Sequence, residues 1–343
     1  MKALRFYGTR DLRYEDVPEP SPGPGEIKTK INVAGICGSD LGVYVSGPPS
    51  GMPINIPITL GHEFSGTVTA VGEGVTGFRV GDRVTANCYT QCGKCFFCQK
   101  GMYNLCLNQG IAGANWDGCM AECMVGPANA FFSLPDSVTE EAGALVEPLA
   151  VAIHAVRQGN VRPGDTVTIL GDGPIGLNAL LAARTAGAAA VYLVSKHKGR
   201  GEVARAMGAT SVLYLSDGDP VPRILELTGG LGTDVCIECV GHTNTPELAV
   251  NLVRKGGTVA IAGLFDKPIP FDFGMLIFGE KTIVGTACYV DEVKTAIALL
   301  ADGRINPSPM VTSKISLANA VELGFEKLLA DKEKSIKILV QIS

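Results

Sequence analysis

The sequence predicts a two-domain α/β protein in which a glycine-rich, mostly β domain is joined to a doubly wound parallel sheet. Up to about residue 150, short strand-like runs are broken by glycine and proline. From Val161 onward, strands and helices alternate at regular length. The length of 343 residues also exceeds what one core usually accommodates.

In the first half, strands are expected at 27–33, 66–71 and 79–85, bounded by turn residues such as the run Ser21-Pro22-Gly23-Pro24-Gly25. In the second half, the apolar run 166–170 predicts a strand of a parallel sheet. Further strands are expected at 191–194, 212–215, 234–239 and 258–262, with helices at 174–186, 200–207 and 247–255.

The C-terminal tail has helical periodicity at 293–300 and near 318–329, followed by a final strand at 336–341. We expect this tail to return to the first domain. The predicted boundaries are therefore residues 1–150 plus 289–343 for the first domain and 151–288 for the second.

Composition excludes several classes of function. A hydrophobic content of 46% with 18% charged residues is typical of a compact globular protein. The net charge of −5, without a basic tract, argues against nucleic acid and anionic membranes as partners. No run of about 18 apolar residues predicts a membrane span, and the first residues lack the long apolar core expected of a signal peptide. Eleven cysteines without a secretory signal favour reduced thiols in the cytoplasm.

Four cysteines lie within fifteen residues, at spacings of two, two and seven: Cys92, Cys95, Cys98 and Cys106. Tetrahedral Zn²⁺ takes four such donors from a short loop. Iron–sulfur sites usually follow other intervals, and adjacent x2 spacings strain a disulfide. Four unlinked thiols are the remaining alternative. Because four ligands leave no open position, we expect a structural zinc in a lobe spanning residues 88–110.

A glycine motif follows the apolar strand directly and opens a helix: Gly171-Asp172-Gly173-Pro174-Ile175-Gly176. Its glycines allow a tight turn, approach of a pyrophosphate to the backbone, and close packing of helix on strand. The helix N-terminus favours the phosphates. This context predicts a dinucleotide site, whereas the motif alone is also compatible with an ordinary glycine-rich turn.

The residues at the end of the second strand of this sheet predict which dinucleotide binds. NAD sites place an acid there to accept from the ribose hydroxyls. This chain has Ser195 instead, and no carboxylate follows before Glu202. A hydroxyl and nearby cations suit a 2′-phosphate. We therefore predict that NADP(H) is preferred over NAD(H), with contacts from Ser195, Lys196, Lys198 and Arg200.

Residues suited to a reactive metal are scattered along the first half: Cys37, His62, Glu63 and Glu147. A thiolate, an imidazole and one or two carboxylates can form an open zinc site that water or substrate completes. Each residue could instead have no role in metal binding: Cys37 could be a buried core residue, His62 a turn residue, and Glu63 and Glu147 surface acids. Their spacing in the sequence does not establish a cluster.

The whole chain resembles the zinc-dependent medium-chain alcohol/polyol dehydrogenases, and within them most resembles (R,R)-butanediol and sorbitol dehydrogenases. The resemblance rests on Gly61-His62-Glu63, on Gly81-Asp82-Arg83-Val84, on the four-cysteine lobe, on Glu147-Pro148-Leu149 and on the nucleotide motif. It implies a GroES-like catalytic domain and a Rossmann domain, two Zn²⁺ per chain, and a homodimer or homotetramer.

The resemblance also implies roles for individual residues. Cys37, His62 and a carboxylate from Glu63, Glu147 or both would hold the catalytic zinc, with Asp40 orienting His62. Ser39 would relay the substrate proton. We expect further cofactor contacts at Val240, Gly263 and Leu264.

Three departures from the family pattern refine the expected function. Gly42 stands where many relatives have a relay histidine, and Cys288-Tyr289 lacks the arginine of sorbitol dehydrogenases. Cys119 and Cys123 replace apolar side chains and are expected to pack or line a pocket. The predicted reaction is hydride transfer between NADP(H) and a secondary alcohol, a vicinal diol or the matching ketone. An aminocyclitol or sugar-derivative dehydrogenase, and a non-catalytic zinc- and nucleotide-binding protein, are the alternatives.

Overall fold

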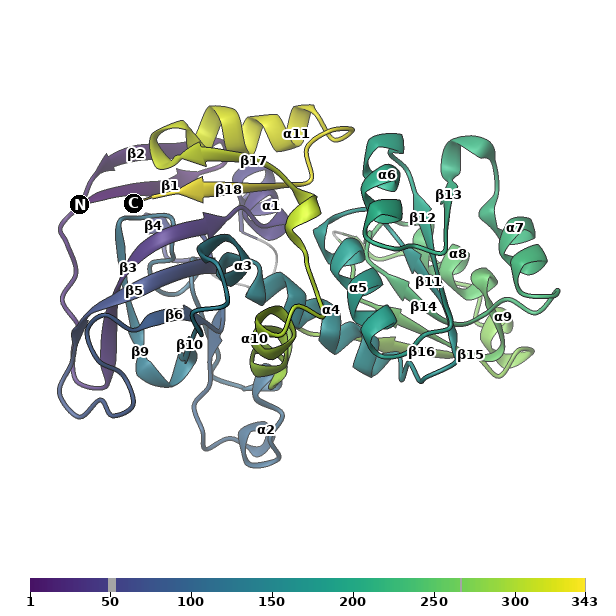
Figure 1. Cartoon of the computed structure of the whole chain (residues 1–343), viewed down its shortest axis with the longest axis horizontal. Helices are drawn as coiled ribbons and strands as arrows, with labels where there is room; N and C mark the ends of the chain where they lie inside the picture. Colours follow the sequence, from purple (N-terminus) through teal and green to yellow (C-terminus); the bar gives the residue numbers. More distant parts are fainter. Residues whose placement is uncertain (49–53, 266, 343) are drawn as a thin grey trace. The chain divides into compact units, whose positions relative to one another are not determined.

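The computed structural model describes residues 1–48, 54–265 and 267–342. The chain forms two compact units, and Figure 1 shows the elements of each (Figure 1). Unit 1 comprises Met1–Glu147, Val293–Asp302 and Val311–Ser343, and unit 2 comprises Pro148–Glu292 and Gly303–Met310. Among the described residues, none of the helices combines the length and the apolar character that a membrane span requires.

Unit 1 consists mainly of strands. These are β1 (Lys2–Gly8), β2 (Asp11–Asp16), β3 (Glu26–Gly35), β4 (Ile58–Thr59), β5 (Glu63–Val71), β6 (Arg83–Ala86), β7 (Tyr89–Thr90), β8 (Gly110–Ile111), β9 (Cys123–Pro127), β10 (Phe131–Ser133), β17 (Val311–Ser316) and β18 (Lys337–Gln341). Its short helices are α1 (Gly38–Ser46), α2 (Phe96–Gln99), α3 (Glu140–Ala144) and α11 (Lys327–Ala330), and α10 (Glu292–Ala301) falls almost wholly within it.

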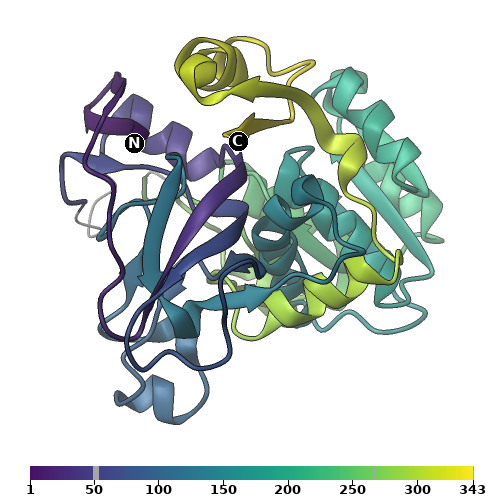
Figure 2. The same cartoon turned by 60° about the vertical axis from the view of Figure 1, so that its left-hand side comes forward.

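The main sheet of unit 1 joins strands from both ends of the chain. Its order is β10-β6-β5-β3-β18-β17, with β9 also paired to β3. The last strand, β18, therefore lies beside β3, as the C-terminal strands drawn in yellow show in Figure 2. Side chains that alternate along β3, including Ile27 and Ile31, are fully buried and pack in one core with Phe64 of β5.

Unit 2 alternates strands and helices. Its strands are β11 (Thr166–Leu170), β12 (Ala190–Ser195), β13 (Ser211–Tyr214), β14 (Thr233–Glu238), β15 (Val253–Ile261) and β16 (Thr282–Gly285). Its helices are α5 (Pro174–Thr185), α6 (Lys198–Ala206), α7 (Pro220–Leu227), α8 (Thr245–Leu252) and α9 (Gly274–Ile277), preceded by α4 (Val146–Gln158), which begins in unit 1.

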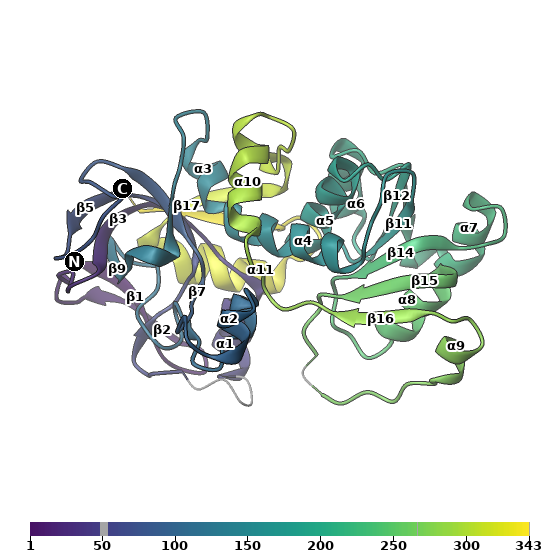
Figure 3. The same ribbon diagram turned by 90° about the horizontal axis from the view of Figure 1, so that it is seen from below.

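All six strands of unit 2 run parallel in the order β13-β12-β11-β14-β15-β16. Counted along the chain this is the 3-2-1-4-5-6 order of the Rossmann fold. Helices α7 and α8 pack with one face of the sheet through Ile224, Ala249 and Val250, and α5 and α6 lie on the other (Figure 3). The predicted doubly wound sheet and mostly β partner domain are confirmed.

Three predicted segments differ from the structure. The strand expected from Arg79 begins only at Arg83, because the Asp82 carboxylate accepts from the Arg79 N–H at 2.9 Å and closes a turn. The helix expected at 318–329 is a π-helix over Ala320–Glu326 followed by α11. In this wide turn Gly324 approaches Ile36 so closely that a Cβ would lie 2.6 Å from its Cδ1.

The third difference concerns the tail. The segment Gly303–Met310, expected with the first domain, belongs to unit 2. It includes a short 3-10 turn, Ser308–Met310, that packs against α6.

Candidate metal and nucleotide sites

The four cysteines of the loop around α2 converge. The Sγ atoms of Cys92, Cys95, Cys98 and Cys106 all lie within 4.8 Å of one another. A zinc tetrahedron with bonds of about 2.3 Å has sulfur–sulfur edges of about 3.8 Å, so the group fits that ion. Gly93, at φ 71°, supplies the left-handed turn that brings the first thiols together.

Backbone N–H groups prepare this loop for negative charge. They come from Lys94 and Cys95 and lower the pKa of Cys92 to about 6, whereas burial raises the pKa of Cys98 to about 12. The Cys106 sulfur accepts from the Cys92 N–H at 3.2 Å and from the Asn108 N–H at 3.4 Å. These donors favour thiolates, the form that binds metal.

A second group joins Cys37, His62 and Glu63, whose potential ligand atoms also lie within 4.8 Å of one another. The sheet explains this convergence. β3 and β5 are antiparallel, and Gly35 at the end of β3 pairs with Glu63 at the start of β5. Cys37 follows β3 at the N-cap of α1, so it lies beside His62.

Asp40, in the first turn of α1, helps to shape this second group. Its carboxylate accepts from the Cys37 N–H at 3.0 Å, and its other oxygen lies 3.8 Å from His62 Nδ1, beyond hydrogen-bond distance. Burial lowers the pKa of His62, but Asp40 and Cys37 outweigh it and raise the pKa well above its usual value. Ser39 is partly exposed on the same turn.

Lys337 of β18 is the residue at this site that sequence reasoning missed. Its ammonium donates to Glu63 Oε2 and to the Ile36 carbonyl at 2.9 Å, and both charged side chains are 1% exposed. Glu63 Oε1 is buried without a hydrogen-bond partner. A buried carboxylate oxygen without a hydrogen-bond partner, beside a thiol and an imidazole, is suited to bind a metal cation.

Glu147 stands outside the 4.8 Å set, although it is only 5% exposed. It lies in the first turn of α4. Burial raises the pKa of this carboxyl and outweighs the opposing effect of the nearby His62. The structure therefore joins three of the four predicted catalytic-metal residues directly and leaves Glu147 nearby.

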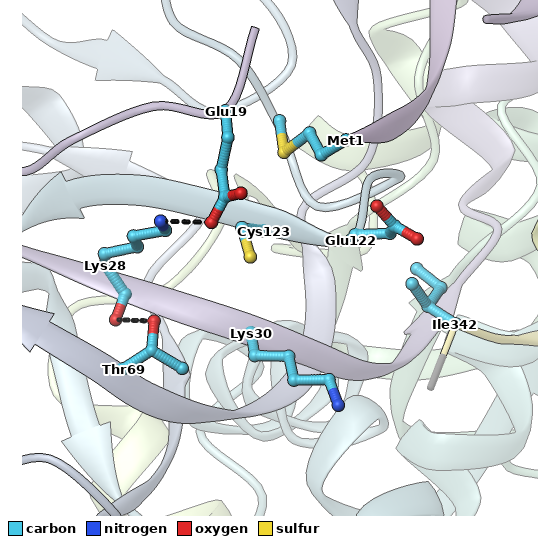
Figure 4. A pocket seen from close by; sticks show the side chains of 8 residues that line it. All are labelled: Met1, Glu19, Lys28, Lys30, Thr69, Glu122, Cys123 and Ile342. Atoms are coloured by element: carbon cyan, nitrogen blue, oxygen red, sulfur yellow. Dashed lines mark hydrogen bonds and ion pairs between the residues drawn. The ribbon is translucent and has the colours of Figure 1, made fainter. Parts of the chain in front are cut away.

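The two unusual thiols of the first half differ in their surroundings. Cys119 is fully buried in the core and its Sγ contacts the Glu63 carbonyl at 3.6 Å. Cys123 lines a pocket of about 530 Å³ (Figure 4). The pocket is also lined by Met1, Glu19, Lys28, Lys30, Thr69, Glu122 and Ile342, and by none of the predicted site residues.

In unit 2 the glycine motif forms the predicted strand–loop–helix turn. Gly171 has φ 119°, Gly173 caps α5, and Pro174 and Ile175 form its first turn. A Cβ on Gly176 would lie 2.1 Å from the Gly171 carbonyl oxygen, so the third glycine is required by packing. Gly173 faces open space, which leaves room for a phosphate against the backbone.

The loops after β14 and β15 reach the same edge of the sheet. Glu238, which is fully buried, accepts from the Val240 N–H at 2.8 Å and the Gly241 N–H at 2.9 Å. The Gly263 N–H donates to the Glu238 carbonyl at 3.0 Å, and Leu264 is 80% exposed. A Cβ on Gly171 would meet Val240, so the predicted cofactor residues from three loops converge where Rossmann sheets bind ligands.

The end of β12 departs from the sequence-based expectation. Ser195 is fully buried and donates to Asp172 Oδ2 at 2.7 Å, whereas Lys196 and Lys198 are exposed. Arg200 lies 3.6 Å from Asp172 Oδ1. The carboxylate of Asp172, in the glycine loop, therefore lies at the end of β12. The sequence feature that could have indicated this contact was the acid at position 172, inside the motif.

Further histidines and cysteines of unit 2 are placed as follows. His154 is buried and contacts Glu292 Oε1 at 2.9 Å, and these two belong to unit 2. His242 is exposed in the loop after β14. Cys236 packs in the core of unit 2, and Cys239 is half-buried after the same strand.

Fold and sites together define a two-unit protein with a nucleotide-binding sheet and a mostly β unit suited to metal. Residues 174–302 match the zinc-binding dehydrogenase model, and residues 23–136 match the alcohol dehydrogenase GroES-like domain. The chain belongs to this family of zinc-binding dehydrogenases. It is thus an oxidoreductase that acts on alcohol groups, as the resemblance predicted.

Individual relatives cover the whole chain. Sorbitol dehydrogenase of Bacillus subtilis is 34% identical over 99% of this chain and 97% of its own. (R,R)-Butanediol dehydrogenase of the same organism is 36% identical over 99% of both. A dehydrogenase described as zinc-binding, from Sinorhizobium meliloti and bound to NADP, superposes with a TM-score of 0.93 at 33% identity, covering 99% of this chain and 98% of its own.

Proposed function

We propose that the protein transfers a hydride between NADP(H) and a secondary alcohol or vicinal diol, or the matching ketone. The observation that carries the proposal is the convergence of Cys37, His62 and Glu63 at the ends of β3 and β5. This donor set, with Glu147 buried nearby, suits a catalytic zinc with an open position.

The chain's own residues have distinct roles in this proposal. Cys37 and His62 would hold the metal, with Glu63, Glu147 or both in turn as the carboxylate ligand. When bound, zinc supplies Lewis acidity toward the substrate oxygen. Lys337 balances the charge of Glu63, and both side chains of this ion pair are 1% exposed, so the pair is shielded from water.

Ser39 is the proposed proton carrier. It lies two residues after Cys37, on the first turn of α1, and is partly exposed. Gly42, on the same helix, offers no imidazole. The substrate proton would therefore leave through the Ser39 hydroxyl toward water or through Glu147.

A second zinc would sit among the four thiols of the α2 loop, giving two per chain. Because all four positions would be filled by sulfur, this metal would hold the loop and take no part in the chemistry. The eleven cysteines of the chain are all unbridged, which supports a reducing compartment, the cytoplasm.

Preference for NADP(H) is supported by the loop after β12. Lys196 and Lys198 are exposed there, Arg200 is close by, and the strand end presents no outward acid. The S. meliloti relative, which shares 33% of its sequence, binds NADP. Exposed cations favour a 2′-phosphate.

The substrate class is supported by the relatives, whose names include sorbitol, butanediol and L-idonate dehydrogenases. The substrates in these names share a hydroxyl group on a carbon next to a second carbon that carries oxygen. The pair Cys288-Tyr289 lacks a cation that would hold a long polyhydroxylated chain, so a short diol or hydroxyketone fits better.

A homodimer or homotetramer is supported by the free edge of the unit 2 sheet. Among the described residues β16 is an edge strand, and exposed apolar side chains occur in it, in or beside α9 and in the loop after β15: Ile283, Phe273, Ile277, Phe278 and Leu264. Such a row of unpaired backbone groups beside apolar surface is usually covered by another chain.

The deciding experiment combines metal counting with a substrate panel. Diketones, hydroxyketones, diols, polyols, amino-sugars and phospho-sugars are each assayed with NADP(H) and NAD(H), and zinc is measured per chain. We expect two zinc ions and the highest kcat/KM with a short diol or hydroxyketone and NADP(H). One zinc without turnover would instead identify a non-catalytic binding protein, and activity confined to amino- or phospho-sugars would identify a sugar-derivative dehydrogenase.

A further inference from the structure

Asp172 is a buried acid that the proposed chemistry does not use. It lies between the two glycines that open the nucleotide motif, and its side chain is 7% exposed. Burial of a carboxylate is costly unless donors surround it. In this case the hydrogen-bond donors are Ser195 at the end of β12 and the two residues that follow it.

The contacts of Asp172 bind that loop at several points. Oδ2 accepts from the Ser195 hydroxyl at 2.7 Å, from the Lys196 N–H at 2.9 Å and from the His197 N–H at 2.8 Å. The His197 ring contacts the carboxylate at 3.1 Å, and Arg200 lies at 3.6 Å. Burial raises the pKa of Asp172, but these donors outweigh it and lower the pKa, so the acid is ionised at neutral pH.

The position of the Asp172 carboxylate explains which charged side chains remain exposed after β12. An acid at the end of the second strand would accept from ribose hydroxyls and repel a 2′-phosphate. In this chain the acid lies beneath the loop, and its contacts engage both of its oxygens. The Ser195 hydroxyl also points inward, donating to Asp172 and lying 2.9 Å from the His197 carbonyl. Lys196 and Lys198 remain as the exposed charges.

We propose that Asp172 is a positioning residue for cofactor choice: it anchors residues 195–197 from below and orients Arg200, so that the loop receives a 2′-phosphate. This rests on the NADP(H) part of the proposed function and deepens it. These contacts hold the carboxylate of Asp172 away from the ribose and leave the side chain of Lys196 exposed for the ligand.

The test measures binding, so it depends neither on zinc nor on the substrate. Adenosine 2′,5′-bisphosphate and 5′-AMP differ only in the 2′-phosphate, and each is titrated into the full-length protein by calorimetry. In D172N the amide oxygen can keep the contacts of Oδ2, but an amide nitrogen replaces Oδ1, and the negative charge that faces the His197 ring and Arg200 is lost. We expect the affinity for the bisphosphate to fall at least tenfold and the affinity for 5′-AMP to change less than threefold.

Two further variants complete the design. Glu202 is an exposed acid of α6 that contacts Arg205 and Tyr214, so E202Q removes the same charge without touching the anchor. It should leave both affinities within twofold. The exchange D172S/S195D moves the acid back to the strand end, and it should favour 5′-AMP over the bisphosphate even if D172N fails to fold.

The outcomes separate this inference from the proposed function. If wild type binds 5′-AMP as tightly as the bisphosphate, the NADP(H) proposal itself is wrong. If wild type prefers the bisphosphate but D172N binds it more tightly, Asp172 repels phosphate and the inference is overturned. Equal losses for both ligands in D172N, or an unchanged preference in the exchange variant, also overturn it, because Asp172 would then only stabilise the loop.

Discussion

The two cysteine-containing groups of unit 1 are built in opposite ways. The four thiols around α2 come from fifteen consecutive residues, and their recorded partners are mainly backbone N–H groups and one another. The group of Cys37, His62 and Glu63 joins two strands, and its charge is balanced by Lys337 from a third strand near the C-terminus. One group depends on a loop, and the other depends on the whole sheet.

This difference separates what each metal would do for the fold. Metal in the α2 loop would order a segment that has little core of its own, as in small zinc modules. The second group is already ordered by the pairing of β3 with β5 and β18, which places its donors before any metal arrives. The contrast therefore predicts that matched substitutions in the two groups affect different properties.

The largest expected effect is on catalysis. Cys37→Ser removes a soft ligand from the proposed catalytic zinc. Because a catalytic metal stabilises the charge of the transition state by several kcal/mol, kcat/KM should fall at least about 10³-fold. Zinc should fall from two to one per chain, while cofactor binding and the Tm stay close to wild type. Cys123→Ser, at a half-buried thiol outside both groups, is the control. A near-normal rate in C37S would contradict the assignment.

The next effect is on the stability of unit 1. Lys337→Met leaves the buried Glu63 without its cation, and breaking a buried pair costs about 3–5 kcal/mol. Urea unfolding of metal-free protein measures this change. Restoring much of the loss in K337M/E63Q would show that the cost is the unpaired charge. Lys30→Met, at an exposed lysine of β3, should stay within about 0.5 kcal/mol. An unchanged urea midpoint for K337M would contradict the proposed dependence of this group on the sheet.

The smallest effect is expected in the loop. Cys106→Ser removes one of the four sulfurs, so one zinc should be lost and limited proteolysis should cut within residues 92–106 sooner than in wild type. The Tm should fall by a few degrees, since about 1 kcal/mol shifts it by roughly 2–4 °C in a unit of this size. Turnover at low temperature should remain above half. A loss of activity as deep as in C37S would show that the groups are not separate.

Local patterns made much of this molecule predictable. The strand β11, its glycine turn and α5 lie where the sequence predicts them, because a buried parallel strand followed by a glycine-rich turn has one common structure. The four-thiol loop converges for the same reason, since its spacing alone limits the geometry.

Long-range partners were not predictable. Lys337 is an ordinary lysine in the sequence, and only the pairing of β18 with β3 buries it against Glu63, 274 residues away. Asp172 was visible inside the motif, but the direction of its side chain depends on where β12 ends. The Asp82 turn, which delays β6, depends on a side-chain contact that strand propensity does not include.

The central place of β18 in its sheet has a consequence for biosynthesis. Residues up to Gln341 have to leave the ribosome before β18 can insert between β3 and β17. During translation, the nascent N-terminal half carries Cys37, His62 and Glu63 without the ammonium group that neutralises the carboxylate. This centre can therefore mature only after β18 has been synthesised, and a variant without residues 337–341 would expose an unfinished sheet to chaperones and proteases.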